Sequence, residues 1–109
     1  MRKIEGTFTA TGFSQSIQIG RYNGDFNFTL GGSGWNASIQ LQRSYDRHLV
    51  ETDADADATW HDVTDGVFTA PVDKKGYEPE DKVYYRFSCT HTAGSIPYRL
   101  GMGDRQVSR

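Results

Sequence analysis

The densest set of potential metal ligands in the sequence is a short run of alternating aspartates. Asp53, Asp55 and Asp57 place carboxylates at positions i, i+2 and i+4, which is how a calcium-binding helix–loop–helix site begins. Such a loop also needs glycine at its sixth position and glutamate at its twelfth. Counted from Asp53, those positions hold Ala58 and Thr64. The run therefore predicts a solvated acidic loop and no metal site.

The other reactive side chains form no catalytic pattern either. His48, His61 and His91 lack the i, i+2 spacing that would place two imidazoles on one face of a strand. The sequence contains no Gly-x-Ser-x-Gly nucleophile elbow and no glycine-rich phosphate loop. Cys89 alternates with other apolar residues and is interpreted as a small core side chain. We expect no enzymatic activity, no cofactor and no disulfide within the chain.

The composition narrows the class of protein. The chain has 109 residues, enough for one domain with its own core, and a formal net charge of −2. Six Phe, six Tyr and two Trp, together with 12 Gly, favour strands and turns over helices. Because the net charge is slightly negative, we expect no nucleic-acid partner. Since the sequence has no apolar run of about 18 residues and no signal peptide, we expect no membrane association and synthesis in a reducing cytoplasm.

Apolar and polar side chains alternate along much of the chain, which predicts strands. In residues 35–42 the apolar side chains would face inward, while Asn, Ser and Gln would face outward. Residues 83–90 alternate in the same way, with Tyr84 and Arg86 on the outward side. Two shorter strands are expected over residues 59–63 and 66–70.

Two local signals refine these strands. Asn23-Gly24 predicts a type I′ hairpin between the strands that flank it, because both residues tolerate positive φ. Pro97 predicts an edge position or a bulge for the last strand, because proline donates no ladder hydrogen bond.

Seven or eight such strands, without helical periodicity, predict an all-β, antiparallel two-sheet sandwich. The patterns do not separate a jelly-roll from an immunoglobulin-like topology. We expect a single domain over residues 1–109 with a flexible C-terminal tail at about 101–109. The predicted core consists of Phe8, Ile17, Phe26, Phe28, Trp35, Ile39, Leu41, Val83, Tyr85, Phe87, Ile96 and Leu100.

Charge is distributed unevenly along the chain. Residues 51–81 contain ten acidic residues and two lysines, a local charge of −8 that leaves +6 on the rest. Such polarity favours an oriented and salt-sensitive docking against a complementary surface. The long acidic segments 47–58 and 71–81 are expected to be loops. Together with the ends 1–3 and 101–109, they are the expected contact regions. The candidate interaction residues are Asp53, Asp55, Asp57, Lys74, Lys75, Tyr84, Met102 and Arg105.

Several phrases, taken in order and spacing, resemble a known group of proteins. They are GTFTATG at 6–12, IQLQRSYD at 39–46, TWHDV at 59–63 and YYRFSCT at 84–90, followed by YRL at 98–100. The sequence resembles small all-β virion structural proteins of tailed bacteriophages over about residues 5–101. A departure is the acidic insertion at residues 50–58, which replaces the short Asp-Gly-Gly turn usual in that group.

The resemblance implies a non-enzymatic virion component made in the bacterial host cytoplasm. A capsid decoration or cement protein that staples neighbouring major capsid proteins fits the length best, and homo-oligomers are expected. The partner would be the major capsid protein or another virion protein. Two alternatives remain: a head–tail connector or tail subunit, and a carbohydrate-binding or tail-fibre-associated module. In the second, Trp35, Trp60 and Tyr84 would be the stacking candidates, although core packing is the favoured role of both tryptophans.

Overall fold

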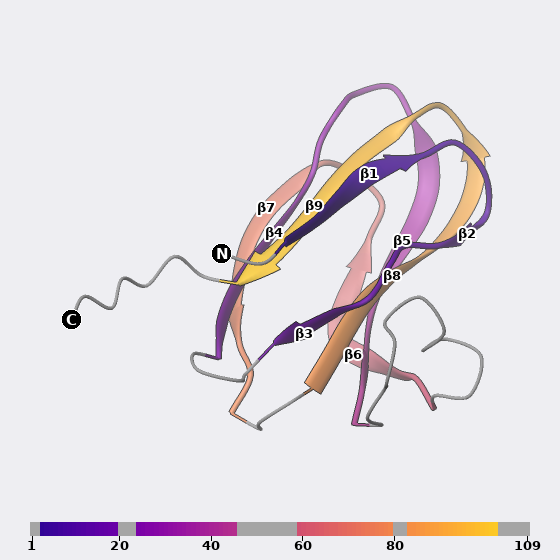
Figure 1. Cartoon of the computed structure of the whole chain (residues 1–109). Helices are drawn as coiled ribbons and strands as arrows, with labels where there is room; N and C mark the ends of the chain where they lie inside the picture. The colour runs from indigo at the N-terminus through magenta and orange to yellow at the C-terminus, as the bar shows by residue number, and fades with distance from the viewer. Residues whose placement is uncertain (1–2, 20–23, 46–58, 80–82, 103–109) are drawn as a thin grey trace.

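The described part of the chain is built entirely from strands and their connections. The computed structural model describes residues 3–19, 24–45, 59–79 and 83–102 (Figure 1). These residues form two antiparallel sheets without a helix, which confirms the predicted all-β sandwich, and none of their elements is a helix able to cross a membrane. The strands are β1 (Lys3–Phe8), β2 (Gly12–Phe13), β3 (Ile17–Ile19), β4 (Asp25–Leu30), β5 (Asn36–Ser44), β6 (His61–Phe68), β7 (Val72–Tyr77), β8 (Val83–Ala93) and β9 (Ile96–Met102).

The order of the strands identifies the sandwich as a jelly roll. Sheet A has the order β1-β9-β4-β7, and sheet B has the order β2-β8-β5-β6, with β3 also paired to β8. Since β2 and β3 both pair with β8, they act as two parts of one strand. The chain is then a ribbon of antiparallel pairs (β1 with β9, β2 and β3 with β8, β4 with β7, β5 with β6) that is rolled into two sheets. The topology that the sequence patterns left open is therefore jelly-roll and not immunoglobulin-like.

The core lies between the sheets and consists of the inward side chains that the alternation predicts. Every residue of the predicted core is buried. Phe28 lies among other aromatic rings, with ring centroids 5.4 Å from Phe68 and 5.8 Å from Phe87. Cys89 is part of the same core, as expected, and burial raises the pKa of its thiol. Each sheet thus has one face that packs against the other sheet and excludes water. The alternation of apolar and polar residues therefore identified the core side chains.

The predicted hairpin at Asn23-Gly24 is wrong. The flanking strands belong to different sheets, because β3 pairs with β8 whereas β4 pairs with β7 and β9. Residues 20–23 lie outside the described residues. Gly24 serves another purpose: its carbonyl accepts a hydrogen bond from the Glu78 N–H at 2.8 Å, and a Cβ at position 24 would clash with the Glu78 carbonyl. Glycine is needed here for close backbone approach, not for a two-residue turn.

The acidic segment 71–81, expected to be a long loop, instead contains strand β7 at the edge of sheet A. Lys74 lies opposite Phe28 and Lys75 lies opposite Asn27 in a regular antiparallel register. Cross-strand partners share a face, so Lys74 starts from the core side of the sheet although its side chain is exposed. An inward-directed charge on an edge strand discourages pairing with a further chain. The polar residues that suggested a loop therefore belong to an edge strand that is protected against pairing with another chain.

β6, an edge strand of sheet B, is one strand with a bulge where two short strands were expected. The register between β5 and β6 shifts between Gln40 and Gln42. Asp65 adopts a positive φ of 60°, and the Gln40 side-chain amide donates to the carbonyl oxygens of Val63 and Gly66 at 3.2 and 3.4 Å. The amide thereby satisfies backbone groups that the bulge withdraws from the ladder, and the bulge disrupts the edge as a template for pairing.

The last strand also differs from its prediction. β9 is an inner strand of sheet A, so the edge position expected from Pro97 is wrong. The β4 ladder begins at the next residue, Tyr98, and the Pro97 carbonyl accepts from the Gly31 N–H at 2.8 Å. The N–H and C=O of a strand residue point to the same side, so an N–H at position 97 would also face Gly31. Because Gly31 lies just beyond the end of β4, the donor that proline lacks is not needed in the ladder between β9 and β4. At the chain ends, β1 begins at Lys3 and β9 extends to Met102, so Lys3, Gly101 and Met102 lie in strands and not in the expected ends. The rest of both ends lies outside the described residues.

Candidate functional site

Two arginines on neighbouring strands of sheet B define the two regions best organised for recognition. In the register of β5 and β8, Arg43 lies opposite Tyr85, and Arg86 lies opposite Gln42. Successive residues of a strand point to opposite faces, so the two guanidinium groups lie on opposite sides of the sheet. Arg43 is directed between the two sheets, and Arg86 lies on the outer face of sheet B.

The first region is a groove at the open side of the sandwich, between β6 of sheet B and β7 of sheet A. Its volume is about 530 Å³, within the range of small-molecule sites. Tyr45 and Tyr77 are exposed on its rim, and the Tyr77 side chain is 67% exposed. The lining consists of Phe26, Arg43, Tyr45, His61, Asp62, Val63, Thr64, Gly76, Tyr77, Glu78, Pro79 and Tyr85.

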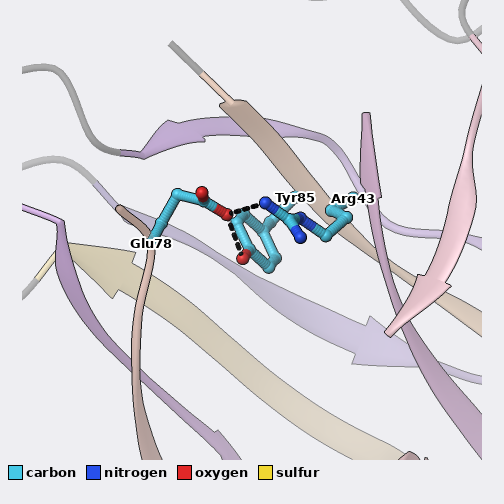
Figure 2. Close-up of polar contacts among 3 residues, drawn as sticks. All are labelled: Arg43, Glu78 and Tyr85. Atoms are coloured by element: carbon cyan, nitrogen blue, oxygen red, sulfur yellow. Dashed lines mark hydrogen bonds and ion pairs between the residues drawn. The ribbon is translucent and has the colours of Figure 1, made fainter. Parts of the chain in front are cut away.

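At the base of the groove, one carboxylate joins the two sheets (Figure 2). Glu78, which follows β7, has a side chain only 1% exposed, and its Oε1 accepts a hydrogen bond from Arg43 Nη2 at 2.5 Å and from the Tyr85 hydroxyl at 2.7 Å. Burial raises the pKa of Tyr85 well above its ordinary value, and the hydrogen bond to Glu78 and the charge of Glu78 raise it further. The phenol therefore stays protonated and acts as a fixed donor.

Above this base, the groove presents side chains suited to hydrogen bonding and stacking. The Arg43 side chain is 26% exposed, and its guanidinium carbon lies 4.9 Å from the centre of the Tyr45 ring. The His61 ring centroid lies 6.0 Å from that of Tyr45. Asp62, the neighbour of His61, directs its carboxylate to the outer face of sheet B instead, where it accepts a hydrogen bond from the Gln42 amide at 3.0 Å. Within the described ranges, no three His, Cys, Asp or Glu residues are grouped as metal ligands.

The second region is a stack of two aromatic rings on either side of Arg86. The guanidinium carbon lies 3.8 Å from the Phe13 ring centroid and 4.2 Å from that of Trp60. Arg86 is only 6% exposed, and its Nε donates to Gln42 Oε1 at 2.9 Å. Phe13 remains 57% exposed on β2. The three side chains form an aromatic surface, here called the Phe13–Arg86–Trp60 stack, that is held in place before any partner binds.

The structure corrects the expected roles of Tyr84 and Trp60 and confirms the expected core position of Trp35. Tyr84, proposed as an outward contact, is only 7% exposed, and its strand neighbour Ser44 is fully buried, so this part of the outer face is covered. Trp35 is buried, and its Nε1 donates to the Gly31 carbonyl at 2.9 Å. Trp60 is half-buried on the outer face and not in the core. Neither Tyr84 nor Trp35 can offer a ring face for stacking.

The remaining candidate residues do not converge on one place. Lys74 and Lys75 are exposed on β7, at the edge of sheet A. Met102 ends β9, where it is half-buried and packs against the core. The last candidates, Asp53, Asp55, Asp57 and Arg105, lie outside the described residues.

Sequence reasoning named Trp60 as a stacking candidate but missed Arg43, Glu78 and Phe13. Arg43 carried a usable signal, because it continues the inward series Ile39, Leu41 and is a charge at an inward position. Glu78 carried none, because it is one of several acids in its segment. Phe13 lies in a strand of two residues, too short for a period to be recognised.

Comparison with known proteins gives information about the fold of the chain and none about its function. No family model matches the chain, and no curated protein matches it significantly. A crystal structure of the Yersinia pseudotuberculosis-derived mitogen is similar, with a TM-score of 0.50 and 12% sequence identity over 97% of this chain and 88% of that one. The low identity limits the likeness to backbone architecture. The chain is therefore similar to this mitogen in fold alone.

Proposed function

We propose that the protein is a non-enzymatic structural component of a tailed-bacteriophage virion, most specifically a decoration protein that binds the major capsid protein. The resemblance to such proteins supports the proposal, and its phrases fall on β1, β5, β8 and β9 and at the start of β6, in both sheets. The protein would be made in the bacterial host cytoplasm and would act as part of the virion. Homo-oligomers on the symmetry axes of the capsid belong to the same proposal.

The observation that carries this proposal is the Phe13–Arg86–Trp60 stack. Aromatic rings and arginine dominate the binding energy of protein interfaces. Phe13 is mostly exposed, yet it is already held against Arg86, so little side-chain entropy remains to be lost on docking. A preformed aromatic surface on a rigid sheet is what a cement protein needs.

Two edges of the sandwich, β6 and β7, favour docking through a face over docking by strand addition. β6 contains a bulge, and β7 carries Lys74 on its core side. Both features disfavour pairing of the edge with a strand of another chain. Many copies on a capsid lattice would let modest single contacts add up by avidity, and the charge asymmetry of the chain would make docking sensitive to salt.

Co-sedimentation with undecorated capsids of the virus that encodes the chain tests the proposal. We expect the wild-type protein to sediment with the capsids, and Phe13→Ala to bind at least about tenfold more weakly. Tyr77→Ala removes a similarly exposed ring at the opposite side of the sandwich and should bind capsids like the wild type.

Two results would contradict the proposal. Failure of the wild-type protein to sediment with capsids at any ionic strength would remove the decoration function. Equal binding of Phe13→Ala and the wild type would remove the stack as the docking surface.

A further inference from the structure

Strand β1 is an edge of sheet A without the features that protect β6 and β7. Among the described residues, β1 pairs with β9 alone, on one of its two sides (Figure 1). Its register is regular from Lys3 to Phe8, it contains no bulge and no proline, and no charged residue lies on its core side. The edge of sheet B beside β8 is different, because β2 and β3 have only two and three residues. A regular, unprotected edge strand such as β1 is a template for pairing with another chain.

The backbone of β9 shows which groups of β1 face this open edge. The Pro97 carbonyl accepts from the Gly31 N–H, on the β4 side of β9. Because backbone groups of successive strand residues point to opposite sides, the even-numbered residues of β9 direct theirs towards β1. They lie opposite the even-numbered residues of β1, which therefore bond to β9. The N–H and C=O groups of Lys3, Glu5 and Thr7 consequently point to the open edge.

The charges at this edge are complementary to those of a second copy of β1. Lys3 and Glu5 share the outer face of the strand, where they form an ion pair at 3.4 Å with side chains 47% and 55% exposed. If two β1 strands pair antiparallel with Ile4 at the centre, Lys3 of each copy lies opposite Glu5 of the other. A centre at Glu5 would place two carboxylates directly opposite each other, which is unfavourable. The charges therefore favour a two-fold axis at Ile4.

The backbone and the core side of β1 fit the same centre. Because Lys3 and Glu5 direct their N–H and C=O groups to the edge, Lys3 of each copy would exchange two hydrogen bonds with Glu5 of the other. The two Ile4 residues would form the closer, non-hydrogen-bonded pair between them, on the face that packs against sheet B. A centre at Gly6 would place Lys3 opposite Thr9, beyond the end of β1 and without an opposite charge.

We propose that β1 is the interface of a two-fold symmetric dimer, in which two copies of the chain pair antiparallel at Ile4 and join their A sheets into one. The dimer deepens the proposed function, on which its role on the capsid rests, by naming the surface of the expected homo-oligomer. A strand of six residues buries less area than a stable dimer needs. The pairing is therefore weak in solution, and neighbouring copies on a capsid lattice would strengthen it by their high effective concentration.

Sedimentation equilibrium of the full chain over a range of concentrations is the first test, and it needs no capsids. We expect the wild type to dimerise reversibly. Lys3→Glu and Glu5→Lys each place like charges opposite each other twice, so each should raise the dissociation constant of the dimer at least about tenfold. An equimolar mixture of the two variants should dimerise again, because every facing pair is then opposite in charge.

Lys75→Glu is the matched control, because it makes the same change on β7, the opposite edge strand of sheet A. It should dimerise like the wild type. Glu5→Pro tests the backbone: the Glu5 N–H faces the open edge, so proline leaves the ladder between β1 and β9 intact but removes two donors from the dimer. We expect this variant to be folded by circular dichroism and monomeric.

Three results would overturn the inference. The first is a wild type that stays monomeric at millimolar concentration, and the second is a dimer that neither charge variant nor Glu5→Pro weakens. The third is a monomeric wild type whose binding to capsids is weakened by Glu5→Pro, which would assign the β1 edge to a strand of the capsid protein. Capsid binding by a chain that does not dimerise would leave the decoration function standing, and a dimer that does not bind capsids would remove that function alone.

Discussion

Arg43 and Arg86 are close neighbours on sheet B, but the protein compensates their charges in different ways. On the inner side, Arg43 meets the buried carboxylate of Glu78, which arrives from the end of the opposite sheet. On the outer side, Arg86 is covered by the rings of Phe13 and Trp60 and bonds to an amide oxygen of the same sheet. The Arg43–Glu78 contact holds the two sheets together, whereas the contacts of Arg86 form a surface on sheet B.

The location of a charged side chain thus determines which of its properties contributes to stability. Between the sheets, water is mostly excluded, so a guanidinium requires an opposite charge and the loss of that charge is expensive. On the outer face, the rings of Phe13 and Trp60 attract the cation through their quadrupoles, and this contact requires a planar group that can stack. The inner region should therefore respond to removal of charge, and the outer region to loss of planarity.

The largest effect is expected from Glu78→Gln, which leaves Arg43 without a counter-charge. We expect a loss of about 3 kcal/mol in the free energy of unfolding, towards the lower end for a broken buried pair because Arg43 is partly exposed. Urea unfolding measures it. The double variant Arg43→Met/Glu78→Gln should lose less than Glu78→Gln alone, since no unpaired charge remains.

The control for this pair is Glu5→Gln, which breaks the exposed ion pair of Glu5 with Lys3 at 3.4 Å. It should cost less than about 0.5 kcal/mol. A Glu78→Gln variant as stable as Glu5→Gln would contradict the role assigned to the buried carboxylate.

The next largest effect is expected from Arg86→Ala, at about 2 kcal/mol, because the stack and the hydrogen bond to Gln42 are both lost. Arg86→Lys keeps the charge but not the planar group, so it should recover less than half of the loss. The same unfolding measurement decides this. Full recovery by lysine would show that charge, and not stacking, matters on the outer face.

A pH dependence above neutrality should distinguish the inner region further. The pKa of Tyr85 is raised in the folded protein, chiefly by burial and then by Glu78, above its ordinary value of 10.0. The folded state therefore keeps a proton that the unfolded state releases above about pH 10, and Tyr85 makes stability fall by up to about 1.4 kcal/mol per pH unit there.

Urea unfolding between pH 9 and pH 11 measures that slope. Tyr85→Phe should flatten it, because phenylalanine has no proton to release. Tyr98→Phe should flatten it to a smaller extent, since burial also raises the pKa of Tyr98. An unchanged slope in Tyr85→Phe would contradict the stated cause.

The smallest effect is expected from Phe13→Ala, which removes only the exposed half of the stack. Phe13 is mostly in water and covers Arg86 from one side, so its loss should cost about 0.5–1 kcal/mol of stability. Thermal unfolding by circular dichroism measures it. A loss as large as that of Arg86→Ala would mean that Phe13 is a structural residue and not a surface prepared for a partner.

Much of the fold could be predicted because strand alternation is a local property. Leu41 and Phe87 sit at positions of a period of two, and the structure buries both, as it buries Cys89 beside them. The same rule was misleading for Tyr84, because an outward position is exposed only when nothing covers the outer face. Segment 71–81 was misread for a related reason: the edge strand β7 is as polar as a loop.

The candidate regions could not be predicted, because each joins side chains far apart in the chain. Glu78 is 35 residues from Arg43, and they meet only because the end of β7 lies beside β5 in the rolled ribbon. Phe13 reaches Arg86 through the pairing of β2 with β8. Neither pairing has a signal in the residues next to these side chains.

The alternation in the sequence was enough to predict the class of the fold, most of the core and the burial of Cys89. These follow from the order of apolar and polar residues along single strands, where the side chain alternates whatever the partner strand is. Only the packed structure reveals the jelly-roll topology, the close approach of Gly24 to Glu78 and the placement of Arg43 and Arg86. Those depend on which distant strands pair, and pairing is set by the packing of the whole sandwich, since many strand orders bury the same inward faces.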